Sequence, residues 1–270
     1  YAPRNVRDAR AAGYTHLSLD LMLGLPQQSL ADWQESVERV LAWEPEHLSF
    51  YALTVEEGTP LAAQIESGAL DDPDEDRTAD MYEWAEDRLE RAGYLHYEIS
   101  NWARPGRESR HNLIYWHNEP YLGLGAGAHS WYAGRRWANT EDPADYIARL
   151  RDAPSSSPPW TLGRPRSAGG IRGGPAAVET QEIDVRQAMS ETMMMGLRLL
   201  QEGVSEARFQ RRFGVSLQDV YHDEIEAAMA EGLLERATLG DGISEGVHRV
   251  RLTRRGHLLG NRVFVRFVGD

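Results

Sequence analysis

The chain has 270 residues, of which 41% are hydrophobic and 26% are charged, a composition that is ordinary for a globular protein with a sizeable core. A formal net charge of -13 without a basic stripe argues against a nucleic-acid-binding protein. No run of about 18 apolar residues occurs, so we expect no membrane-spanning segment, and the absence of cysteine favours a cytoplasmic location.

The first half of the chain alternates predicted strands with predicted helices. Three segments have the apolar pattern of a strand: residues 17–23, 47–55 and 94–100. Two helices are predicted between them, the first capped by Ser29 and the second preceded by an acidic cluster at 71–76, which complements the helix N-terminus rather than binding a metal. Because strand–helix–strand units are normally parallel, this order indicates an α/β fold that forms a barrel or part of one.

Each predicted strand carries a polar residue toward its end. These residues are Asp20, Thr54 and Glu98. Since functional side chains of parallel barrels gather at the carboxyl ends of the strands, the three positions favour a ligand site, with hydrogen bonding inside the barrel as the alternative.

The stretch 97–131 combines aromatic residues, histidine and bare backbone. Four residues follow a turn: His111, Asn112, Tyr115 and Trp116. A glycine-rich run at 122–130 then contains His129. Alternate glycines usually mark a close approach of the backbone, so the stretch suits a flat, partly apolar ligand. The alternative is a buried loop with a satisfied histidine.

The other histidines give no comparable signal. His117 is poorly spaced from His111 for two ligands on one helix face. Six further histidines are interpreted as structural or solvated, at element ends or on exposed faces: His16, His47, His96, His222, His248 and His257. Neither a Gly-x-Ser-x-Gly elbow nor a Walker motif is present.

A segment rich in Pro, Gly and Ser, residues 153–178, predicts a linker between a first domain at 1–152 and a second at 179–270. The second domain has three predicted helices, at 185–200, 203–213 and 217–231, then a hairpin from 233–235 and 247–252, and a last helix at 257–267. Helices followed by a hairpin resemble a small winged-helix-like α+β domain. Its basic residues are few, so we expect a role other than DNA binding.

Several strings in the chain resemble the oxygen-independent coproporphyrinogen oxidase-like radical SAM proteins. They occupy residues 19–26 (LDLMLGLP), 51–54, 97–101, 124–130 and 252–256. The block at 111–116 matches the HNxxYW motif of one branch, the HemW heme chaperones. The resemblance implies part of a TIM-like radical SAM barrel followed by the C-terminal domain of that family.

The resemblance also implies a function, which is to bind heme and deliver it to hemoproteins. Heme would contact His111, Asn112, Tyr115 and Trp116, since imidazole can ligate iron and aromatic rings offer faces to a porphyrin. S-adenosylmethionine would lie beside three other residues: Asp20, Thr54 and His129.

The chain departs from the family at its start. The family holds a 4Fe-4S cluster through a Cys-x3-Cys-x2-Cys loop near the N-terminus, and neither this loop nor any other cysteine occurs here. We therefore expect an N-terminally truncated member without radical activity of its own, and its status as an enzyme stays open.

Two other functions compete with the heme chaperone. One is a coproporphyrinogen dehydrogenase, which decarboxylates propionate side chains and belongs to the same family. The other is a barrel hydrolase that uses Asp20 and Glu98, which no motif supports.

Overall fold

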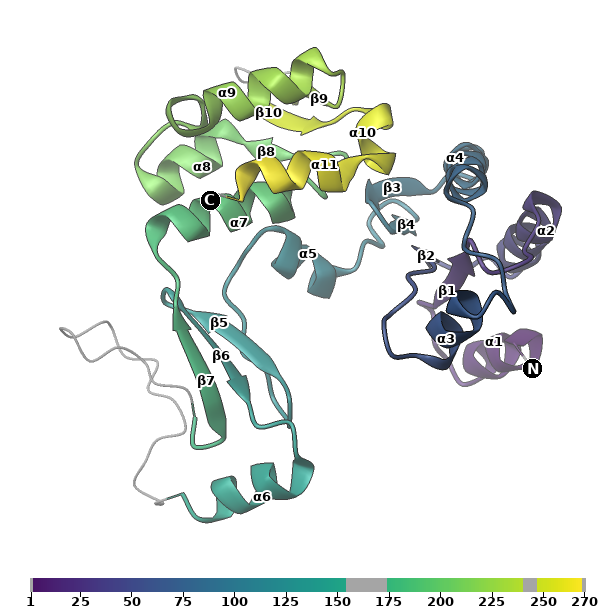
Figure 1. Cartoon of the computed structure of the whole chain (residues 1–270), viewed down its shortest axis with the longest axis horizontal. Helices are drawn as coiled ribbons and strands as arrows, with labels where there is room; N and C mark the ends of the chain where they lie inside the picture. Colours follow the sequence, from purple (N-terminus) through teal and green to yellow (C-terminus); the bar gives the residue numbers. More distant parts are fainter. Residues whose placement is uncertain (1, 154–173, 240–246, 269–270) are drawn as a thin grey trace.

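The computed structural model describes residues 2–153, 174–239 and 247–268 (Figure 1). The elements of the first half are, in chain order, α1 (Ala2–Ala11), β1 (Ser18–Leu23), α2 (Leu30–Leu41), β2 (His47–Ala52), α3 (Pro60–Glu66), α4 (Glu75–Arg91), β3 (Leu95–Glu98), β4 (Asn101–Ala103) and α5 (Arg110–Trp116). Local capping explains two helix starts, as the sequence predicted. Ser29 forms a capping box with Asp32 at α2, and Asp74 of the acidic cluster caps α4.

The first sheet has the strand order β1-β2-β4-β3. β1 and β2 pair in parallel from Ser18 and His47 onward, as predicted. The strand predicted at 94–100 is found as β3 but ends earlier, at Glu98, where the chain turns and returns as β4, which is antiparallel to both β2 and β3. The turn has a physical cause: the buried Glu98 carboxylate accepts hydrogen bonds from the Ser100 backbone N–H and the Asn101 side chain.

One face of the first sheet packs against α2 and α4. Trp33 of α2 is fully buried there, stacks edge-to-face on Phe50 of β2 at 4.9 Å and donates its ring N–H to the Met81 carbonyl at 2.9 Å. On the opposite face, Met22 and Tyr51 stay 47% and 45% exposed. Period-two alternation therefore gives β1 a helix-covered side and an open side.

A small sheet of three antiparallel strands follows α5. Its elements are β5 (His129–Tyr132), β6 (Arg135–Asn139) and β7 (Ala177–Glu182), with α6 (Pro143–Arg151) after β6. Most of the predicted linker, residues 154–173, lies outside the described residues. β7 pairs with β6 and contains the division predicted at residue 178, so this position lies within a strand of the small sheet.

The remaining elements form the C-terminal module, which we define as α7 through η1. They are α7 (Val185–Gly196), β8 (Val204–Ser205), α8 (Glu206–Phe213), α9 (Leu217–Ala230), β9 (Leu234–Leu239), β10 (Val247–Leu252), α10 (Arg254–Leu258), α11 (Gly260–Phe264) and the 3-10 helix η1 (Val265–Phe267). Its antiparallel sheet has the order β8-β10-β9. The helices and hairpin confirm the winged-helix-like prediction, although three short helical pieces replace the single last helix. None of the helices in the described part of the chain has the length and apolar character needed to cross a membrane.

The C-terminal module is joined to the first sheet by backbone pairing. Leu199 bridges Glu98 in antiparallel fashion, and the Leu200 N–H donates to the Tyr97 carbonyl at 3.1 Å. Figure 1 shows α5 between the first sheet and α7. The end of β3 therefore helps to determine where the C-terminal module is placed.

Gly203 lies in the turn between α7 and β8 of the C-terminal module. Its φ is +59°, and a Cβ there would lie 2.3 Å from the Val250 carbonyl oxygen. Gly214 also has a positive φ, +78°, but a Cβ there would meet nothing within 4 Å. The two glycines therefore separate the cost of the backbone conformation from the cost of a steric clash.

We expect Gly203→Ala to destabilise the protein well beyond Gly214→Ala. The positive φ costs each variant about 1–2 kcal/mol, and the clash adds about 1–3 kcal/mol or more at position 203 only. Urea unfolding followed by far-ultraviolet circular dichroism measures both free energies of unfolding. Equal losses in the two variants would contradict the close packing of Gly203 against β10.

Candidate functional site

The helix α5 carries the HNxxYW block and is held at both ends. At its start, Ser109 accepts a hydrogen bond from the Asn112 N–H at 3.3 Å and caps the helix. At its end, His117 hydrogen-bonds Glu202 at 2.8 Å, and the Asn118 amide donates to Thr192 at 3.1 Å. Since Thr192 lies on α7 and Glu202 follows it, the C-terminal module fixes the end of α5.

His111 and Tyr115 are four residues apart and lie on the same side of α5. Their rings meet edge-to-face with centroids 5.0 Å apart, and Tyr115 meets Tyr121 in the same way at 4.6 Å. The His111 side chain is exposed. The imidazole therefore stands at the solvent end of a row of aromatic rings.

Trp116 is placed differently from the other residues of the block. The Arg198 guanidinium lies 4.4 Å from the centre of one of its rings, and its indole N–H is buried without a partner among the described residues. Trp116 also lines a pocket of about 40 Å³ together with His117 and Thr192. This volume is far below the roughly 300 Å³ or more of a small-molecule pocket. Trp116 therefore anchors α5. The sequence predicted that Trp116 offers a ring face to heme, and at most one side of the ring is free to do so.

A chain of hydrogen bonds runs from β1 to α5. Ser18 contacts His47 Nδ1 at 2.8 Å, and His47 Nε2 contacts the Tyr97 hydroxyl at 2.9 Å. The same hydroxyl accepts from the Ser109 N–H at 3.4 Å. Tyr97 therefore braces the start of the helix through Ser109, which also accepts the Asn112 backbone N–H.

His47 is buried at 8% exposure and hydrogen-bonded at both ring nitrogens, so of the two predicted alternatives, structural or solvated, it is structural. Burial lowers the pKa of His47, against the opposing charges of Asp20 and Glu108, and favours a neutral imidazole that both accepts and donates in the chain. Sequence reasoning missed His47, Tyr97 and Arg198 as supports of α5. Only Tyr97 carried a signal, as the first residue of the matching string at 97–101.

The residues predicted to line S-adenosylmethionine are not brought together. Asp20 is exposed on the open side of β1, and Thr54 is exposed two residues after β2 ends. His129 begins β5 in the small sheet, and Figure 1 shows β5 well separated from β1. The described residues therefore place Asp20 and Thr54 at one sheet and His129 at another.

Glu98 does not share an open strand end with Asp20 and Thr54. It is fully buried, its second carboxylate oxygen lies 3.7 Å from the Arg198 guanidinium, and burial raises its pKa despite that neighbour. β4 also separates β3 from β2. The prediction of a common site is wrong for Glu98, and the hydrolase that pairs it with Asp20 loses its basis.

The glycine-rich run is satisfied by its own surroundings. A Cβ on Gly123 would lie 2.1 Å from the His129 carbonyl oxygen, so the close approach is to the start of β5. The Gly125 carbonyl accepts from the Asn139 amide at 2.9 Å, and the Gly125 N–H donates to the Tyr146 hydroxyl at 3.1 Å. These bonds favour the structural interpretation of the glycines over a ligand cradle.

Comparisons with known proteins agree with this arrangement. A model of the HemN C-terminal domain matches residues 183–240. The heme chaperone HemW of Bacillus subtilis is 36% identical over 262 residues, which cover 97% of this chain and 61% of that protein. The mouse protein named radical S-adenosyl methionine domain-containing protein 1, mitochondrial, is 34% identical over 236 residues, or 86% of this chain and 50% of its own length.

A solved structure shows the same fold. It is coproporphyrinogen III oxidase (HemN) from Escherichia coli, a radical SAM enzyme, with a TM-score of 0.65 and 17% identity over 97% of this chain and 57% of that one. The predicted fold class is thereby confirmed. The chain spans about three fifths of the length of the curated relatives it matches first. On this evidence the chain belongs to the HemW-type family within the coproporphyrinogen oxidase-like radical SAM proteins.

Proposed function

We propose that this chain binds heme on the exposed side of α5 and passes it to hemoproteins, as a heme chaperone does. The observation that carries the proposal is the exposed His111 imidazole beside Tyr115, on a helix held at both ends. The names of the relatives support the same function.

The geometry supports a surface site rather than a pocket. An imidazole is an axial ligand for heme iron, and Tyr115 adds apolar ring surface next to it. An open site leaves the second face of the porphyrin free for an acceptor protein. In this proposal His111 ligates, Tyr115 packs, and Asn112 and Trp116 position the helix.

This chain has no cysteine and so offers no thiolate for a 4Fe-4S cluster. For S-adenosylmethionine we propose that the open side of β1 and β2 takes part through Asp20 and Thr54, whereas His129 would join only if the small sheet and the first sheet contribute to one site.

We expect His111→Ala to weaken the binding of hemin by at least about tenfold, which corresponds to about 1.4 kcal/mol. The side chain is exposed, so the fold should persist. His222→Ala removes an exposed histidine from the C-terminal module and serves as the matched control. Hemin titration followed at the Soret band, with circular dichroism as the check on folding, measures both effects.

Metal-free protoporphyrin distinguishes this function from the dehydrogenase of the same family. A site built on histidine and iron should bind the metal-free ring much more weakly than hemin. Equal affinity for the two rings, or a Soret band unchanged by His111→Ala, would rule out His111 as the iron ligand and favour a general tetrapyrrole site.

We also expect the chain as given to have no radical activity. Reconstitution with iron and sulfide under anaerobic conditions should yield no stable 4Fe-4S absorption, because cysteine thiolates hold such clusters. Reductive cleavage of S-adenosylmethionine by the reconstituted chain, detected as 5′-deoxyadenosine, would refute this expectation.

A further inference from the structure

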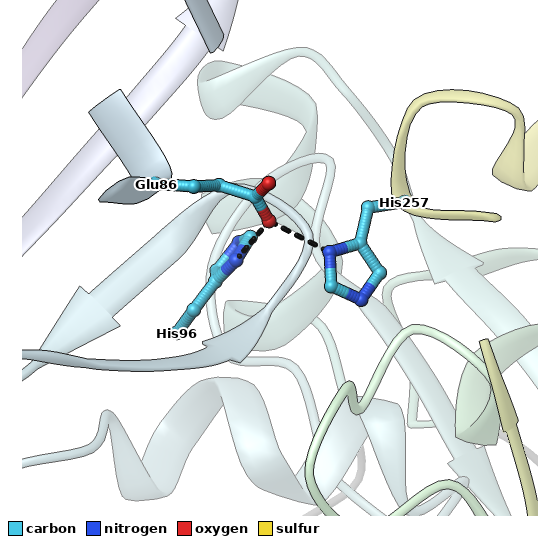
Figure 2. Close-up of side chains that lie close together, drawn as sticks. All are labelled: Glu86, His96 and His257. Atoms are coloured by element: carbon cyan, nitrogen blue, oxygen red, sulfur yellow. Dashed lines mark hydrogen bonds and ion pairs between the residues drawn. The ribbon is translucent and has the colours of Figure 1, made fainter. Parts of the chain in front are cut away.

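A cluster of three side chains joins the first sheet to the C-terminal module. Glu86 of α4 places one carboxylate oxygen, Oε1, 2.9 Å from His96 Nδ1 and 2.7 Å from His257 Nδ1. Figure 2 shows the two imidazoles converging on this carboxylate from β3 and α10. The side chains are only 10–14% exposed. Of the two predicted alternatives, structural or solvated, His96 and His257 are therefore not solvated.

The partners of His96 Nε2 define where its proton lies. Nε2 is 3.2 Å from the Ile99 carbonyl oxygen, which can only accept. The Tyr82 hydroxyl donates its own hydrogen to that carbonyl at 2.7 Å, so toward Nε2, at 3.3 Å, it also presents an acceptor. Nε2 must then carry the hydrogen, and in a neutral imidazole Nδ1 is left with a lone pair.

That lone pair faces a carboxylate oxygen 2.9 Å away. Two acceptors at this distance repel each other unless a proton or a metal ion lies between them. A second proton would bury an imidazolium in a cluster whose carboxylate already lies 2.7 Å from His257 Nδ1 and contacts Arg254 through its other oxygen at 3.4 Å. A metal ion removes the repulsion by using both lone pairs.

The surroundings match those of a metal site in two respects. A histidine that ligates a metal typically donates its other N–H to a backbone carbonyl, as His96 does to Ile99. Arg254 holds the carboxylate oxygen that would not bind the ion. Two imidazoles and one carboxylate form the His2Glu donor set of four-coordinate zinc, with the fourth position left to water.

We propose that Glu86, His96 and His257 bind a divalent transition-metal ion, with Zn²⁺ the best match. Their ligand atoms all lie within 4.8 Å of one another. Donors around tetrahedral Zn²⁺ are about 3.3 Å apart, so each imidazole moves outward from Glu86 by roughly 0.5 Å. The ion links α4 and β3 to α10 and fastens the C-terminal module to the first sheet.

The test is a titration of the metal-stripped chain with Zn²⁺ by calorimetry and with Co²⁺ by visible absorption. We expect one ion per chain, the absorption of four-coordinate Co²⁺, and a higher melting temperature with Zn²⁺. His257→Ala should weaken the affinity for Zn²⁺ by about 100-fold or more. This exceeds the loss expected when a residue that only hydrogen-bonds a metal ligand is removed. His248→Ala, which removes an exposed histidine of β10, should leave the affinity unchanged.

Glu86→Gln separates metal binding from folding. The amide keeps the size of the side chain and accepts a hydrogen bond from His257, but it is a poor metal ligand. If the folded Glu86→Gln chain binds Zn²⁺ as tightly as the wild type, or if the wild-type chain binds no stoichiometric ion, the proposal is overturned. Should the variants fail to fold, ¹⁵N spectra of the wild-type histidines decide, because Zn²⁺ must then shift the Nδ1 signals of two of them.

Discussion

The hydrogen bond from the Leu200 N–H to the Tyr97 carbonyl marks the junction on which the rest of the structure depends. The side chain of Tyr97 connects His47 in β2 to the start of α5. The next residue, Glu98, holds the turn into β4 and faces Arg198, whose guanidinium covers Trp116. One short segment thus fixes the sheet, the candidate heme helix and the C-terminal module in register.

The structural features that the sequence predicted correctly are determined by residues that lie close together along the chain. The capping box at Ser29, the alternation of β1 and the start of α4 are local features, and each was found where expected. The path after β3 was missed, because it depends on the Glu98 carboxylate turning inward to bond Ser100 and Asn101. A polar residue at a strand end has the same pattern whether it faces solvent or the core.

In the candidate site, too, the sequence indicated the local segment but not its long-range contacts. The HNxxYW block marked the segment that forms α5, although no helix was predicted there, and the separate roles of its residues come from distant contacts. Trp116 is covered by a residue 82 positions later, Arg198, and the Tyr97 hydroxyl on β3 holds Ser109, the cap to which the Asn112 N–H donates. Of the four residues, only His111 is exposed, whereas Asn112, Tyr115 and Trp116 are half-buried.

The double anchoring of α5 has a mechanical consequence. This helix of seven residues is bonded at one end to side chains of the first sheet and at the other to the C-terminal module, so it acts as a strut between them. A seven-residue helix is about 10 Å long and too short to bend. Any hinge rotation between the first sheet and the C-terminal module must therefore tilt α5 and reorient the His111 imidazole. Ligand binding at His111 would then depend on the angle between these two parts of the chain.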